Sequence, residues 1–320
     1  MSGELSSNGT MQRRGFLKAA ALSISTVTSS SYAEREKGCG LAMGTYGMSS
    51  LSLEDSVRLI GETGFDALEL TVFPGTPGHP SVAFDTAEKR ARFQGWLEDH
   101  ELRWTAVMAD FRPEADERKH REQLLELALL VEMLYKLAPS NPPIIQTILG
   151  GKEWLESRNL FRDRLANWNQ VLADLKGYVA IKPHRNHAMS SPKHAKWLLD
   201  QLGNPRRLSM VFDYSHYVYG ELPMTVDEAV NVSLPMTSYV AVKDAVKREG
   251  KVRYALPGTT DSWDQSDVIG ELYWGGYRGD FCCEVSAQVW REPNYDAVEA
   301  TQVSYRNMVE AFERGGVPRA

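Results

Sequence analysis

The stretch SLEDSVRLIGETGFDALELTV, residues 52–72, contains the unit from which the rest of the chain is built. Its first half has apolar residues at three- and four-residue spacing between Ser52, a potential N-cap, and Gly64, a potential end, which is typical of an amphipathic helix. Its second half, residues 67–72, is a short apolar run typical of a buried strand. The stretch therefore predicts a helix followed directly by a strand.

The same alternation recurs from residue 41 onward. Strand-like runs occupy residues 41–46, 67–72, 103–108, 143–149, 178–183, 208–213, 239–244 and 281–286. Helical spacing is clearest at residues 52–64, 87–100, 114–138, 156–177 and 294–316. Strands that alternate with helices predict parallel pairing, and eight such units favour a closed barrel. A doubly wound open sheet is the alternative, but no glycine-rich phosphate loop follows the first strand. We expect an α/β fold, a single (β/α)8 TIM barrel over residues 41–320.

The N-terminal segment differs from the rest of the chain. Arg13 and Arg14 precede a short apolar region, which ends at the small-residue site Ser31-Tyr32-Ala33. This order of features is typical of a cleavable twin-arginine export signal, and the apolar part is too short to span a membrane. We therefore expect a signal peptide over residues 1–33, a short linker over 34–40, and a periplasmic mature protein without stable membrane insertion.

Composition and charge narrow the function classes. The 320 residues are 42% hydrophobic and 24% charged, and the formal net charge is −6. This balance disfavours nucleic acid and anionic membranes as partners. The three cysteines, Cys39, Cys282 and Cys283, fit no zinc spacing and form no complete disulfide framework. A small-molecule substrate is the expected partner, and a homo-oligomer is possible.

Polar residues gather at the predicted strand ends, where the active sites of TIM barrels lie. A charged side chain on a barrel strand is buried, so it must be paired, bound to a ligand or functional. For Glu69 and Asp244, an ion pair with a nearby lysine is as good an interpretation as a functional role. Six strand-end residues are expected to converge on one small mouth: Lys182, His184, Asp213, His216, Lys243 and Glu284. Other polar residues at the strand ends include Tyr46, Gln146, Arg185 and Gln288.

Taken together, residues 40–315 resemble the sugar phosphate isomerase/epimerase family, the xylose-isomerase-like TIM barrels of the AP endonuclease 2 superfamily. The resemblance rests on an ordered set of short motifs: TGFDALEL, AIKPH, VFDYSH, VKDA, LPG and CEVS. It implies a divalent metal held by a strand-five Glu, a strand-six Asp, a strand-seven His and a strand-eight Glu. It also implies that the two glutamates move a proton next to a carbonyl, and that a further His contacts the substrate.

This chain matches the implied pattern at Asp213, His216 and Glu284 and departs from it twice. Lys182 stands in place of the strand-five Glu, and Ala241 in place of the strand-seven His. Asp213 and Glu284 alone are fewer ligands than a catalytic metal site usually has. Two interpretations stay open: Lys182 takes the place of the metal, or His184 and His216 help Asp213 and Glu284 to rebuild a site for Mn, Zn or Co.

Together with the export signal, the resemblance implies an exported isomerase, epimerase or lyase that acts on a sugar or keto-sugar. Glu284 is the expected base, Lys182 the group that stabilises an oxyanion, and His216 or His184 a hydrogen-bonding partner of the substrate. Substrate-binding roles are expected for Arg185, Lys243, Gln146, Gln288 and Tyr46. The alternatives are a Schiff-base lyase or aldolase that uses Lys182, and an inactive barrel that binds a sugar.

Overall fold

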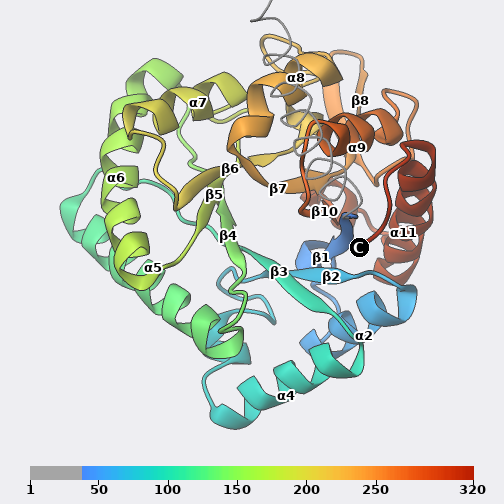
Figure 1. Cartoon of the computed structure of the whole chain (residues 1–320), viewed down its shortest axis with the longest axis horizontal. Helices are drawn as coiled ribbons and strands as arrows, with labels where there is room; N and C mark the ends of the chain where they lie inside the picture. The colour runs from blue at the N-terminus through green and yellow to red at the C-terminus, as the bar shows by residue number, and fades with distance from the viewer. Residues whose placement is uncertain (1–37) are drawn as a thin grey trace, which may run out of the picture. The chain divides into compact units, whose positions relative to one another are not determined.

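The computed structural model describes residues 38–320, and the predicted export signal lies outside them. Eight parallel strands close into a barrel in the order β1, β10, β7, β6, β5, β4, β3 and β2 (Figure 1). Their bounds are β1 Gly40–Gly44, β2 Ala67–Thr71, β3 Arg103–Met108, β4 Ile144–Thr147, β5 Val179–Ile181, β6 Leu208–Phe212, β7 Thr237–Val242 and β10 Asp280–Cys283. The predicted TIM barrel is confirmed.

Helices surround the strands (Figure 1). The longer ones are α2 Leu53–Thr63, α4 Ala87–Asp99, α5 Glu117–Leu137, α6 Trp154–Leu175, α7 Pro192–Gln201, α8 Val226–Ser233, α9 Gln265–Trp274 and α11 Ala297–Arg314. Short helical turns are α3 Pro80–Ala83, α10 Ala287–Trp290, η1 Thr45–Gly47, η2 Tyr214–His216 and η3 Leu234–Met236. Within residues 38–320, no helix is long and apolar enough to cross a membrane.

Local sequence sets the ends of these helices, and for α2 they are the predicted ones. The Ser52 side chain accepts a hydrogen bond from the backbone N–H of Asp55 at the start of α2, and Gly64 ends that helix with a φ of 105°. Glycine reaches this left-handed conformation without steric cost. Thr225 and Glu228 form a reciprocal capping box at the start of α8. The two N-caps fix where α2 and α8 begin, and Gly64 fixes where the chain leaves α2 towards β2.

One supersecondary element was not predicted. After β7 the chain forms a two-stranded antiparallel hairpin, β8 Asp244–Arg248 and β9 Lys251–Ala255. Its turn residues Glu249 and Gly250 have φ values of 49° and 76°, as a tight hairpin turn requires. The strand predicted to run to residue 244 therefore ends at Val242, because the chain turns there into the hairpin.

The core has two parts. The larger one lies between the strands and the surrounding helices and contains most of the buried apolar residues. The smaller one fills the barrel interior and consists mainly of small side chains: Ala42, Ala67, Ala106, Ala180, Val211, Tyr239, Ala241 and Cys282. All three cysteines are buried and free. The small interior residues leave room on the barrel axis for the longer polar side chains of the next layer.

Candidate active site

The polar site is the next layer of side chains along the barrel axis. Side chains two residues apart on a strand point to the same side. Two positions beyond the small interior residues therefore come Glu69, Gln146, Lys182, Asp213, Lys243 and Glu284. All six are buried. The alternation that builds the strands thus also brings these residues together at the carboxyl end of the barrel.

Four of these residues form a closed ring of ion pairs, which we call the charge cluster: Lys182, Asp213, Lys243 and Glu284. The Lys182 Nζ atom lies 2.8 Å from Asp213 Oδ2 and also contacts Glu284 Oε2. The Lys243 Nζ atom lies 2.8 Å from Glu284 Oε1 and also contacts Asp213 Oδ2. Each ammonium therefore bridges both carboxylates, and the formal charges of the cluster sum to zero.

The charge cluster holds its members in their ionised forms. Burial by itself would raise the pKa of the Asp213 and Glu284 carboxyls, but Lys182 and Lys243 hold both pKa values below their ordinary range. Burial would lower the pKa of Lys182, whereas Asp213 and Glu284 raise it above its ordinary value. A Schiff-base lysine must lose its proton, so this environment opposes that role for Lys182.

The cluster does not fit the divalent metal that the resemblance implies. The carboxylate oxygens of Asp213 and Glu284 that a cation would need are already bound by two ammonium groups. Among residues 38–320, no group of three or more His, Cys, Asp and Glu side chains is placed to hold a metal. The rebuilt metal site that the sequence left open is therefore not formed by His184, His216, Asp213 and Glu284.

The family resemblance assigns a metal ligand to the position of Ala241 on β7, but the residue of this segment that contacts the carboxylates is Lys243. Ala241 lies in the small interior layer. Lys243 comes two residues later, and its ammonium contacts both Asp213 and Glu284. Lys243 was predicted to bind substrate, and it does not line the neighbouring cavity. Its contacts make it part of the charge cluster.

Two histidines and a tyrosine pack beside the cluster. The Nε2 atom of the fully buried His216 lies 3.4 Å from Asp213 Oδ2, and its Nδ1 lies 2.8 Å from the hydroxyl of Tyr254. The ring centroids of His184 and His216 lie 4.0 Å apart. Burial, with Lys182 nearby, lowers the pKa of His184 to about 3, and burial also lowers that of His216. Both imidazoles are therefore neutral.

Tyr254 is a site residue that the sequence reasoning missed. It lies on β9 of the unpredicted hairpin, and its backbone N–H donates to the side chain of Gln288 on α10. The signal was present in KREGKVRY, residues 247–254, where Gly250 separates two short runs in the pattern of a hairpin. Gln288, predicted to bind substrate, is exposed and supports this hairpin instead of lining the cavity.

A cavity of about 160 Å³ opens beside the charge cluster. Its lining consists of Tyr46, Phe73, Met108, Ala109, Asp110, Arg112, Gln146, Thr147, Ile148, Lys182, His184 and Glu284. Lys182 and Glu284 supply a charged wall, whereas Tyr46 and Phe73 meet edge to face with ring centroids 5.7 Å apart. Of the predicted substrate-binding residues, Tyr46 and Gln146 line this cavity. Arg185 does not, and its guanidinium bonds to Asn186.

For Glu69 and Asp244 the sequence left open an ion pair with a nearby lysine. Within the described part of the chain, neither residue forms such a pair. Gln146 donates a hydrogen bond to Glu69 Oε2, and burial, with the Glu284 carboxylate nearby, raises the pKa of Glu69 to about 7. Asp244 accepts hydrogen bonds from the backbone of Thr260 at 2.8 Å and from Gln265 at 2.7 Å. Asp244 therefore ties the hairpin to the start of α9.

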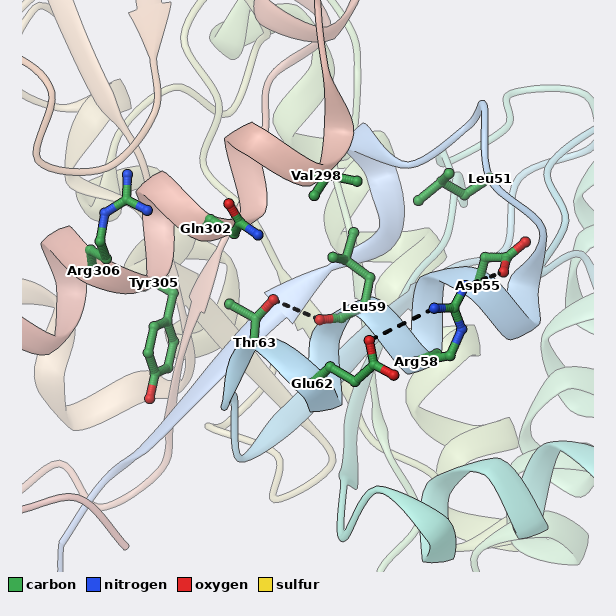
Figure 2. A pocket seen from close by; sticks show the side chains of 10 residues that line it. All are labelled: Leu51, Asp55, Arg58, Leu59, Glu62, Thr63, Val298, Gln302, Tyr305 and Arg306. Carbon is green, nitrogen blue, oxygen red and sulfur yellow. Dashed lines mark hydrogen bonds and ion pairs between the residues drawn. The ribbon is translucent and has the colours of Figure 1, made fainter.

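A wider groove of about 710 Å³ lies away from the strand ends, between α2 and α11 (Figure 2). Three of its charged groups pair along α2, since Arg58 contacts Asp55 at 2.6 Å and Glu62 at 3.7 Å, and Arg306 on α11 is the fourth. No residue of the charge cluster lines it. The strand-end cavity is the better candidate for an active site, because buried ionised groups converge on it.

No protein-family model matches this chain, and no curated protein matches it. Solved structures do match it. A xylose isomerase domain protein from Alicyclobacillus acidocaldarius aligns with a TM-score of 0.69 and 15% identity, over 87% of this chain and 99% of the other. The IolI protein with a bound zinc atom aligns at 0.70 and 14%, over 86% and 98%. L-ribulose 3-epimerase aligns at 0.66 and 13%, over 87% and 96%.

These similarities span nearly the whole barrel at low sequence identity, so they establish the fold. The IolI structure contains zinc, whereas in this chain two lysines occupy the carboxylates that the resemblance assigns to a metal. The chain has the fold of the xylose-isomerase-like TIM barrels, as its sequence resemblance implied.

Proposed function

We propose that this protein is an exported carbohydrate-modifying enzyme of the isomerase, epimerase or lyase type. Its reaction is the removal of a proton from a carbon next to the carbonyl of a sugar or keto-sugar. The observation that carries the proposal is the contact between Lys182 and Glu284 on one wall of the cavity. Similarity in fold to an L-ribulose 3-epimerase and to a xylose isomerase domain protein supports it.

Lys182 is suited to stabilise negative charge on a substrate oxygen. Its ammonium has three hydrogens, and the contacts with Asp213 and Glu284 use two of them. The side chain also lines the cavity. The third hydrogen can donate to the oxygen of an enediolate, and a fixed positive charge in a buried site stabilises such an intermediate strongly.

Glu284 is the group best placed to take the proton. Its carboxylate lines the cavity and is ionised. In the absence of substrate, Lys182 and Lys243 make it a weak base. When a substrate oxygen binds to Lys182, it shares the positive charge that holds the pKa of Glu284 low, so that pKa rises. The carboxylate therefore becomes a stronger base when substrate is bound.

The other cavity residues suit a saccharide. Tyr46 and Phe73 offer apolar surface to the C–H face of a sugar ring, while Gln146 and His184 offer polar groups to its hydroxyls. One carboxylate base suffices for isomerisation or for elimination from a 3-keto-glycoside. Epimerisation through two opposed carboxylates would need a second base, and Lys182 stands at that position.

Hydrogen–deuterium exchange tests this function. The mature protein is incubated in D2O with ketoses and 3-keto-glycosides, and loss of the C–H signal next to the carbonyl is followed by NMR. We expect exchange with the native protein and a loss on the order of 100- to 10,000-fold in Glu284→Gln and Lys182→Met. The control is Lys196→Met, because Lys196 is an exposed lysine on α7 that pairs with Asp200.

The other outcomes identify the alternatives. Thermal stabilisation by a sugar without any exchange would contradict an enzymatic role and support a sugar-binding barrel. Irreversible modification of Lys182 by borohydride in the presence of substrate would contradict the oxyanion role and support a Schiff-base mechanism. Exchange that is equally fast in Glu284→Gln would show that another residue is the base.

A further inference from the structure

The charge cluster contains a second lysine, Lys243, that has no direct role in the proposed reaction. Lys182 alone would suffice to bind a substrate oxygen, yet Lys243 is equally buried and contacts the same two carboxylates. The two lysines directly follow β5 and β7, which are not adjacent in the barrel. Together they place two positive charges between Asp213 and Glu284.

We infer that Lys182 and Lys243 together replace a divalent cation, so that the charge cluster is a built-in, metal-independent cation site. Two ammonium groups carry the same total charge as one divalent ion. Like an ion, they are bound by Asp213 from β6 and Glu284 from β10, and so they link the ends of four strands. This property of the site is independent of which reaction it supports.

Three features of the cluster exclude a metal ion. Both carboxylates already accept hydrogen bonds from two ammonium groups. The Oδ1 atom of Asp213, on the far side of that carboxylate, accepts a hydrogen bond from the Ser215 hydroxyl at 2.6 Å. An incoming cation would also have to approach two positive charges at a few ångströms, where buried charges repel strongly.

One side chain remains that could serve a metal if the lysines were absent. The Nε2 atom of His216 is buried, has no hydrogen-bond partner among the described residues, and lies 3.4 Å from Asp213 Oδ2. With a carboxylate at position 182, this nitrogen would join three carboxylates, and such a set has the number and kind of ligands that Mn²⁺ or Zn²⁺ prefers. The lysines are therefore the feature that keeps the site free of metal.

Metal binding by the native protein is the first test, and it does not require a substrate. The purified mature protein is titrated with MnCl2 and ZnCl2 in a calorimeter, its metal content is measured by elemental analysis, and thermal unfolding is followed with and without EDTA. We expect no bound metal and the same unfolding midpoint in both conditions. About one equivalent of metal in the native protein, lost in Asp213→Asn, would overturn the inference.

A rebuilt site gives the complementary test. In Lys182→Glu/Lys243→Met we expect uptake of about one equivalent of Mn²⁺ or Zn²⁺ and a rise of the unfolding midpoint with metal concentration. The matched control, Lys182→Met/Lys243→Met, removes the same charges but adds no ligand and should bind far more weakly. If Lys182→Glu/Lys243→Met folds and binds no metal, the inference is contradicted. If that variant does not fold, the native titration decides alone.

The inference and the proposed function fail separately. Absence of proton exchange together with absence of metal binding would contradict the enzymatic role and still support the replacement of a metal by two lysines. Proton exchange that requires bound metal would contradict the ammonium pair and leave the enzymatic role standing.

Discussion

Glu69 and Glu284 are both buried near the same end of one barrel, yet their environments differ in kind. Glu69 accepts a hydrogen bond from the neutral Gln146, and burial raises its pKa to about 7. Glu284 contacts two ammonium groups, which hold its pKa below the ordinary range in spite of burial. Glu69 lies on β2 and Glu284 directly follows β10, and only β1 separates these two strands. Partner charge, and not depth, therefore decides which buried carboxylate is ionised.

Removing one ammonium group of the charge cluster should change the stability of the protein most, because Glu284 then loses one of the two charges that distinguish it from Glu69. Lys243→Met leaves Asp213 and Glu284 with a single positive partner, and breaking a buried ion pair typically costs about 3–5 kcal/mol. We expect a loss of this size in the free energy of unfolding, measured by urea denaturation. The exposed pair of Lys196 and Asp200 supplies the control, and Lys196→Met should leave stability nearly unchanged.

A second substitution sharpens that result. In Lys243→Met/Asp213→Asn the unpaired negative charge is also removed, so part of the lost stability should return, and a double-mutant cycle measures the coupling between the two sites. Additive losses would show that Lys243 and Asp213 do not stabilise each other.

Glu69→Gln should have an intermediate effect that depends on pH. The pKa of Glu69 is raised in the folded state, from 4.5 to about 7, so the native protein binds the extra proton and loses stability as the pH rises through this window. A neutral amide avoids that loss. The variant should gain stability relative to the native protein between pH 5 and 7, by roughly 3 kcal/mol in total.

The measurement is urea unfolding of both proteins at several pH values. A stability difference that is constant from pH 5 to pH 8 would show that Glu69 titrates normally. Asp213 and Glu284 stay ionised in the folded state of both proteins over this range, because Lys182 and Lys243 hold their pKa values low.

The smallest change in stability is expected for a substitution in the β8–β9 hairpin. Tyr254→Phe removes the hydrogen bond to His216 Nδ1, and a loss of about 1 kcal/mol in unfolding free energy is expected. The control is Tyr178→Phe, because the partly exposed ring of Tyr178 lies against Arg207 and would be kept.

Nitrogen NMR of His216 adds a readout that packing alone would not change. We expect the proton of the neutral imidazole on Nε2, which lies 3.4 Å from Asp213 Oδ2, so that Nδ1 accepts a hydrogen bond from the Tyr254 hydroxyl. The native protein should therefore show Nε2–H, and Tyr254→Phe should shift the Nδ1 signal. A proton found on Nδ1 would reverse the direction of this hydrogen bond.

Much of the fold could be predicted from local pattern. Ser52 and Gly64 mark the ends of α2 as expected, and all eight predicted strands form the barrel. The β8–β9 hairpin escaped prediction because its short, partly buried strands carry several charged residues and lack the apolar run that marked the others. For the same reason Tyr254 on β9 was not predicted as a site residue. Gln288 was predicted to bind substrate, a role that its exposure on α10 does not support.

Local sequence was enough to show which residues stand at the ends of strands, because strand periodicity is local and puts every second side chain on the same side. That selected Lys182, Asp213, Lys243 and Glu284 for one mouth. Their partners, in contrast, depend on the closed barrel. Lys182 and Glu284 are 102 positions apart in the chain, and closure of the barrel sets which ammonium meets which carboxylate. The sequence therefore shows which residue types stand at the site. Whether each of these side chains is protonated depends on neighbours that only the folded chain supplies.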